Sequence, residues 1–215
     1  MLRTSFAGGA IALLLASAAC GGTSTDPGDG SRTLEVRADV DLKSTYADFE
    51  VRVRRGGDNV SDARVRIFSD LGDTELVYDG GGDYEGRQNG HARWYEVDVE
   101  VGDDWLYGTV VAPEPARIVD PDPNEPWRPR EADDGVMWIS WSGKLADRVR
   151  VETDEFEWEG EDRGELGIPA TAFQDREDEI EIRRRNETPL IGGVSSSRLR
   201  VTAETETSIA IIDPY

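Results

Sequence analysis

The side chains best suited to catalysis are one histidine and a run of serines. His91 lies in an Asn-Gly-His-Ala segment, and Ser195, Ser196 and Ser197 follow one another. A histidine can act as a general base and a serine as a nucleophile, but no G-x-S-x-G sequence surrounds these serines. A single histidine also disfavours a Ser-His-Asp triad or a cluster of histidine metal ligands. We therefore assign no catalytic residue, interpret both segments as turns and predict that the protein is not an enzyme.

Acidic residues near glycines and prolines are the second candidates, because Ca²⁺ binds oxygen ligands. Their spacing differs from the D-x-[DN]-x-[DN]-G pattern of a calcium loop. A catalytic carboxylate pair cannot be chosen either, since that chemistry needs a known separation across a cleft. We assign no metal ligand and no cofactor, and keep a Ca²⁺ site as an alternative. The two acidic groups are Asp70, Asp73, Asp79 and Asp83, and then Asp120, Asp122 and Glu125.

Two further features could bind a ligand. Arg183, Arg184 and Arg185 form a basic island, which strand alternation would divide between two faces. Among the six tryptophans, Trp94 lies opposite the inward row of its predicted strand and is the best candidate for stacking on a sugar. Packing in a core or between domains is the alternative use of the tryptophans.

The charge of the chain limits its partners. The 215 residues contain 45 acidic and 24 basic side chains, a formal net charge of −21. Such a surface repels nucleic acids and anionic lipids, and it attracts cations or a basic protein. A solubilising or salt-adapted surface is the alternative interpretation.

The only cysteine, Cys20, ends an apolar N-terminal run and excludes an intramolecular disulfide. Arg3 precedes the apolar residues 7–19, which are too few to span a bilayer and are typical of a secretory signal. We predict a signal peptide over residues 1–19. The polar, glycine-rich residues 20–32 then predict an attachment point and a flexible linker.

The sequence Ser17-Ala18-Ala19-Cys20 resembles the lipobox of bacterial lipoproteins. Ala18, Ala19 and Cys20 match, whereas Ser17 stands where that family usually has leucine. The resemblance implies that Cys20 carries fatty acyl groups such as palmitate and anchors the chain in the cell envelope. Gly21, instead of aspartate, follows the cysteine, which resembles the default sorting of such proteins to the outer membrane, where the chain would face the periplasm or the exterior. Ordinary cleavage at the small residues before Cys20, releasing a soluble protein, is the alternative.

Alternation of apolar and polar residues predicts β-strands throughout the rest of the chain. In residues 33–113 it is clearest over 34–42, 49–53, 63–67 and 95–101. Residues 59–68, with Ala63 opening the strand, resemble transthyretin-like or carboxypeptidase-regulatory-like domains and other immunoglobulin-like modules. That resemblance implies a β-sandwich and no activity.

A proline-rich stretch, residues 113–134, predicts a junction before a second sandwich over residues 114–215. Trp127 is expected to pack across that junction, and residues 136–141 predict a central strand that is apolar on both faces. Alternation recurs at 155–159, 179–183 and 198–204. The order of these segments resembles fibronectin-III or immunoglobulin-like domains.

Together these observations predict an all-β protein with two tandem immunoglobulin-like sandwiches behind a lipid anchor. We expect a non-enzymatic envelope protein of the adhesion, scaffolding or protein-binding type, held to the membrane through Cys20 and partnered by another envelope protein. A carbohydrate- or Ca²⁺-binding accessory module of a secreted system is the alternative.

Overall fold

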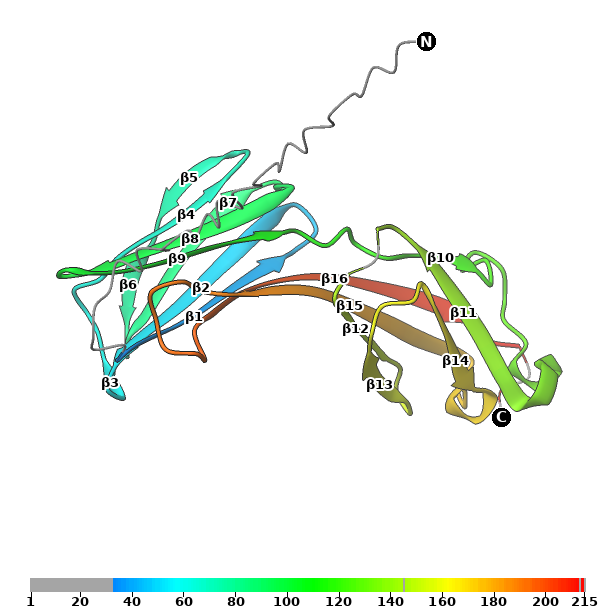
Figure 1. The fold of residues 1–215 in the computed structure, drawn as a ribbon. Helices are drawn as coiled ribbons and strands as arrows, with labels where there is room; N and C mark the ends of the chain where they lie inside the picture. The colour runs from blue at the N-terminus through cyan, green and yellow to red at the C-terminus, as the bar shows by residue number, and fades with distance from the viewer. Residues whose placement is uncertain (1–32, 145, 213, 215) are drawn as a thin grey trace, which may run out of the picture.

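A computed structural model describes residues 33–144, 146–212 and 214 of the chain. These residues form sixteen strands and three short 3₁₀ helices (Figure 1). The predicted signal peptide, linker and Cys20 lie outside the described residues. The strands of the first half are β1 (Leu34–Leu42), β2 (Tyr46–Arg55), β3 (Asp58–Asn59), β4 (Arg64–Ser69), β5 (Gly72–Glu75), β6 (Val77–Gly80), β7 (Asp83–Asn89), β8 (Trp94–Val101) and β9 (Asp104–Val111). The second half contains β10 (Arg117–Asp120), η1 (Pro129–Glu131), η2 (Asp133–Gly135), β11 (Val136–Ser142), β12 (Arg148–Glu152), β13 (Glu157–Gly160), β14 (Glu165–Pro169), η3 (Ala170–Ala172), β15 (Glu177–Pro189) and β16 (Arg198–Ala210).

One large sheet runs through the whole molecule. Its strand order is β13-β12-β15-β16-β1-β2-β7-β6, with β3 paired to β2. Two smaller sheets, β5-β4-β8-β9 and β10-β11-β14, complete two sandwiches. We call the sandwich containing β4 and β8 the first lobe, and the one containing β11 and β14 the second lobe. The prediction of an all-β sandwich protein is confirmed.

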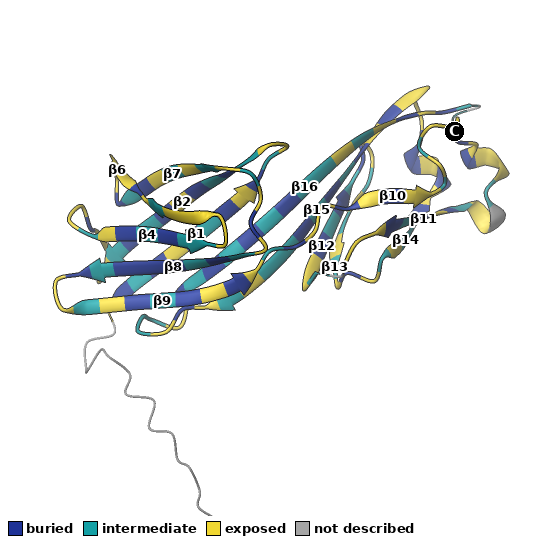
Figure 2. Cartoon of the chain, turned by 90° about the horizontal axis from the view of Figure 1, so that it is seen from above, coloured by how far each residue is buried: buried dark blue, intermediate teal, exposed yellow. Residues whose placement is uncertain are grey.

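The C-terminal hairpin β15–β16 belongs to both lobes. β16 begins beside β1, in parallel register from Arg37 and Arg198 to Leu42 and Ala203, and ends in the second lobe. β15 pairs with β16 over its full thirteen residues and with β12 over residues 181–185. Figures 1 and 2 show the two strands running from one lobe into the other.

The alternation along β16 explains how one strand serves two cores. Leu199, Val201 and Ala203 are buried in the first core, and Ile209 is buried in the second. All four have odd numbers, so they point to the same face of the sheet. Both small sheets therefore pack on that face. The opposite face of the large sheet carries the polar, partly exposed residues of the same strands (Figure 2). The predicted ranges 33–113 and 114–215 did not include this sharing of a hairpin.

Two local predictions for the second lobe were wrong. Trp127 does not pack across the junction: it is 2% exposed in the second core, edge-on to Phe173 with 6.0 Å between ring centroids. Its backbone also bonds to β16, so the proline-rich stretch is part of the second lobe. β11 is central in its sheet, but only one face is buried. Met137, Ile139 and Trp141 point inward, whereas Trp138 is 62% exposed.

Candidate functional site

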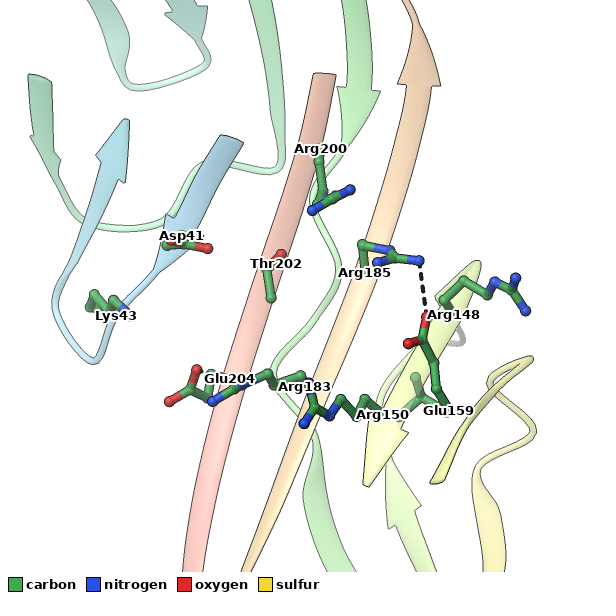
Figure 3. Close-up of a pocket in the computed structure, with 11 residues that line it drawn as sticks. Asp41, Lys43, Arg148, Arg150, Glu159, Arg183, Arg185, Arg200, Thr202 and Glu204 are labelled. Atoms are coloured by element: carbon green, nitrogen blue, oxygen red, sulfur yellow. Dashed lines mark hydrogen bonds and ion pairs between the residues drawn. The ribbon is translucent and has the colours of Figure 1, made fainter. Parts of the chain in front are cut away.

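The candidate site is a shallow groove on the open face of the large sheet, where the two lobes meet. Its cavity volume is about 320 Å³, and its walls come from β1, β12, β13, β15, β16 and the turn after β1 (Figure 3). We call this feature the junction groove. It is lined by Asp41, Lys43, Arg148, Val149, Arg150, Glu159, Arg183, Arg185, Arg200, Thr202 and Glu204.

Strand register gathers four arginines in the junction groove. Arg183 and Arg185 lie two residues apart on β15 and point to the open face, while Arg184 between them is buried. On β12, Arg148 pairs in register with Arg185, and Arg150 pairs with Arg183. Cross-strand neighbours have Cβ atoms about 5 Å apart, and alternate residues along a strand are about 7 Å apart. The four arginines therefore start from a patch of the sheet that measures about 5 Å across the strands and about 7 Å along them.

The junction groove differs in charge from the rest of the molecule. Its lining contains six cationic side chains and three carboxylates, a net charge of +3, in a chain of net charge −21. A local excess of positive charge attracts anions, whatever the sign of the whole protein.

Carboxylates partner most of these cations. Arg185 donates to Glu159 at 3.1 Å, and Arg183 donates to Glu204 at 3.0 Å. Arg200 lies 3.3 Å from Glu187 and 3.5 Å from Asp39. These pairs offset part of the repulsion between neighbouring arginines, and the lining as a whole remains positively charged.

Two arginines of the groove retain unused donors. Arg148 is exposed, and no ion pair of Arg148 is found within the described residues. The Nε atom of Arg150 is buried without a hydrogen-bond partner, although the other end of that side chain pairs with Glu152 and Glu157. Of these two, only the exposed Arg148 is accessible to an incoming acceptor, with which it can form a charge-assisted hydrogen bond.

The pKa shifts at the groove follow from burial and neighbouring charge. Burial opposes the charged form of Arg183, but Glu181 and Glu204 outweigh it, and the pKa of Arg183 is raised. Burial also raises the pKa of Asp41, although Lys43 acts in the opposite direction. Arg183 therefore stays charged at every pH at which the protein is folded.

A carboxylate cluster borders the groove on the side of the second lobe. Oxygens of Glu181, Glu204 and Glu206 lie within 4.8 Å of one another, which is close enough for a shared cation. Glu181 and Glu204 already pair with Arg183, and burial raises the pKa of Glu181. These pairs account for the cluster as part of the ion-pair network.

Two of the residues that suggested catalysis, Ser197 and His91, are engaged in structural bonds. Ser197 is 1% exposed, and its Oγ accepts from the backbone N–H of Val36 at 3.1 Å. The exposed His91 hydrogen-bonds through Nε2 to the backbone oxygen of Lys43, which holds its loop against the turn after β1. These contacts give Ser197 and His91 structural roles.

The two predicted acidic groups are not brought together as metal ligands. Asp70 accepts from both the backbone and the side chain of Arg93, which lower its pKa. Asp83 forms a two-point pair with Arg52, with N–O distances of 2.6 and 3.0 Å. Asp122 accepts from the backbone and side-chain nitrogens of Asn124, which lower its pKa. Among the described residues, the only acidic cluster with metal-ligand spacing is the one beside the groove.

The most exposed tryptophan is Trp138, and Trp94 is only partly exposed. Trp94 does point to the outer face of its sheet, as predicted, but its neighbours cover part of the ring. Trp105, 38% exposed, stacks on Tyr107 with ring centroids 4.7 Å apart and donates to Asp98 at 2.8 Å.

Sequence reasoning missed the junction groove because it considered Arg183 and Arg185 on one strand only. The Arg-x-Arg spacing at 148–150 and 183–185 is only a weak signal for it, because the same spacing recurs at 52–54, 64–66, 128–130 and 198–200. In the two segments of the groove the arginines flank an inward residue, so each pair lies on the polar face of its strand.

No family model and no curated protein matches the chain. Among solved structures, a segment of two fibronectin type-III domains from chicken tenascin is similar at 13% identity and a TM-score of 0.27. That alignment covers 82% of this chain and 98% of the tenascin segment. The two sandwiches are evident from the strand order of the chain's own sheets. Within the described residues, no helix has the length and apolar character needed to cross a membrane.

Proposed function

We propose that this protein is a non-enzymatic binding protein tethered to the bacterial cell envelope through acylated Cys20. The support at the N-terminus is the apolar run that ends in Ala18-Ala19-Cys20. Multiple acyl chains hold a protein to a membrane far more firmly than one, since each buried CH₂ contributes about 0.8 kcal/mol. The outer membrane is the proposed location, with the folded part facing the periplasm or the exterior.

The observation that carries a binding role is the shared hairpin β15–β16. Two sandwiches joined by a short linker would move relative to one another, whereas thirteen paired residues make the joint part of a sheet. Strands of this length extend about 40 Å at ~3.3 Å per residue. The result is a stiff, elongated body suited to holding a binding surface away from its attachment point.

The direction of the chain gives this body an orientation. Leu34, where β1 begins, pairs with Arg55 at the end of the first lobe that lies away from the second lobe. β16 runs parallel to β1 and ends at Ala210 in the second lobe. A tether that enters at Leu34 therefore places the first lobe near the membrane and the second lobe far from it.

Fractionation of bacterial cells tests the tether. Wild-type protein is expected to sediment with membranes and to be released by detergent but not by high salt. Cys20→Ser should appear in the soluble or secreted fraction. Ser17→Ala, a control that leaves the cysteine in place, should fractionate as wild type does. Membrane association of Cys20→Ser equal to that of wild type would overturn the proposal.

A second candidate function, glycan binding, is favoured by Trp138. The ring lies on the outer face of β11 opposite Gly167, where an added Cβ would meet ring atoms at 3.4 and 3.5 Å. The glycine thus gives the indole room to lie close to the sheet. In the next row Ser140 pairs with Glu165 on one side and Asp120 on the other. A flat aromatic ring beside hydroxyl and carboxylate groups suits a sugar, which has an apolar face and polar edges.

Calorimetry of the full chain with cello-, chito- and manno-oligosaccharides tests this candidate. Trp138→Ala should weaken binding at least about tenfold, and Trp138→Phe should retain most of it because the ring remains. If none of these sugars releases heat, or if Trp138→Ala binds as wild type does, the glycan function is excluded for this face.

A further inference from the structure

We propose that the junction groove is a binding site for a compact anion that carries two or more oxyanion groups. The inference goes beyond tethering and glycan binding, and it uses a different face of the molecule from Trp138. Its chemistry is that of guanidinium with oxyanions, in which a planar fork donates two parallel N–H bonds to carboxylate or phosphate oxygens.

Arginines of β12 and β15 lie opposite one another in the groove. Arg148 lies directly opposite Arg185, and Arg150 lies opposite Arg183. Like charges at such positions destabilise a sheet. A departure from local sequence rules that the fold itself does not need is typical of a functional site. Carboxylates pair with Arg150, Arg183 and Arg185 and offset part of this repulsion. The lining still has a net charge of +3, which a bound anion would offset further.

Two cations of the groove have hydrogen-bond donors without a carboxylate partner. Arg148 lies on β12 at the rim of the groove, with its side chain directed outward from the other arginines in Figure 3, and no ion pair of this residue is found within the described part of the chain. Lys43, at the opposite wall, makes no ion pair in the described residues either, although Asp41 is its electrostatic neighbour. These donors belong to opposite walls of one cavity, so a ligand with two anionic ends can reach both.

The dimensions and borders of the groove limit the size of the ligand. The cavity of about 320 Å³ is near the lower end of the range for small-molecule sites. On one side, the next row of the same face contains Glu152, Glu181 and Glu206. On the other side, Asp48, Glu50 and Glu85 line the adjoining hollow. A long polyanion would pass over both acidic borders and be repelled by them, since charges act over ~8 Å at physiological salt. A compact anion stays inside the basic region.

Titration of the full chain with citrate, inorganic pyrophosphate and long-chain polyphosphate tests the proposal. Citrate or pyrophosphate should bind with one-to-one stoichiometry, and binding should weaken as salt is raised from about 0.02 to 0.5 M. Stronger binding of citrate would identify a polycarboxylate ligand, and stronger binding of pyrophosphate a phosphate ester. Either result supports the site. Binding of neither anion, or of long-chain polyphosphate alone, would overturn it.

Variants locate the binding in the groove. Arg148→Gln and Lys43→Gln should each weaken binding about tenfold, the effect of losing a charge-assisted hydrogen bond. Arg163→Gln is the matched control, because Arg163 is an arginine with a 76% exposed side chain outside the groove. Thr202→Glu adds a carboxylate beside Arg185 without removing any arginine, and it should abolish binding. Unchanged affinity in Arg148→Gln and Thr202→Glu, with thermal unfolding equal to that of wild type, would refute the site.

The groove and the tether can fail independently. Cys20→Ser does not alter the groove, so the full-length variant should bind the same anions with the same affinity. Loss of membrane attachment with retained anion binding would therefore separate the two proposals.

Discussion

Arg184 and Asp162 form an ion pair in which both side chains are fully buried, with Nε 2.6 Å from Oδ2. Asp162 also accepts from the indole N–H of Trp141 and from the backbone N–H groups of Ala146 and Gly164. Arg184 donates to the backbone oxygens of Glu114 and Lys144. The pair therefore ties β15 to the segment that enters the second lobe and to the loops after β11 and β13.

Breaking this pair should strongly destabilise the protein. Arg184→Met leaves a buried carboxylate without its cation, and we expect a loss of about 3–5 kcal/mol in the free energy of unfolding. Urea denaturation measures it. The control is Arg163→Met, which removes an exposed pair with Glu161 and should change stability by about 0–1 kcal/mol. Equal effects of the two substitutions would show that the buried pair does not hold the junction.

Asp162 also predicts how stability depends on pH. Burial raises its pKa, but the N–H groups of Ala146 and Gly164 and the Arg184 guanidinium lower it more, and the net shift is downward. A carboxyl with a depressed folded pKa stabilises the fold above its unfolded pKa of about 3.9, and that contribution is lost as pH falls through the folded value. The difference in unfolding free energy between wild type and Asp162→Asn should be constant above about pH 5 and shrink below pH 4. A difference that grows on acidification would contradict this assignment.

Asp178 should behave in the opposite way. Burial raises its pKa, despite a hydrogen bond from the backbone N–H of Glu179 at 2.8 Å. The ionised form therefore costs stability at neutral pH, and the cost disappears as pH falls through the raised folded pKa. Asp178→Asn retains the acceptor oxygen and removes the charge. Its unfolding free energy should exceed that of wild type at pH 7, and the two should converge in acid. A less stable variant at pH 7 would count against the burial argument.

The packing of the β15–β16 turn on the first lobe can be tested with two glycines of the same backbone conformation. Gly192 and Gly57 both have φ +96°, but a Cβ on Gly192 would lie 2.3 Å from the backbone oxygen of Trp105, whereas Gly57 has nothing within 4 Å. Strain at positive φ costs about 1–3 kcal/mol at both sites, and Gly192→Ala should lose clearly more. Thermal unfolding of both variants measures the difference. Similar melting temperatures would mean that the turn does not press on β9.

Much of the fold was predictable because its signal is local. Alternation over residues 34–42 and 198–204 identified β1 and β16 as strands with one buried face, since side chains on a strand alternate between faces.

Long-range pairing was not predictable in the same way. Ile209 and Val201 follow the same alternation, and nothing in the sequence says that they enter different cores. The surroundings of Trp127 and Trp138 were predicted wrongly because the sequence does not show whether a facing layer covers an apolar side chain. The junction groove depends on the register of β12 against β15, which is a property of the folded sheet alone.

The tether is the central claim of the proposed function, and the mature N-terminus tests it most directly. Mass spectrometry of the N-terminal peptide, prepared from protein purified out of bacterial membranes, should find Cys20 as the first residue, with its sulfur and amine acylated. A mature chain that begins before or after Cys20, or an unmodified thiol on that residue, would contradict the proposal.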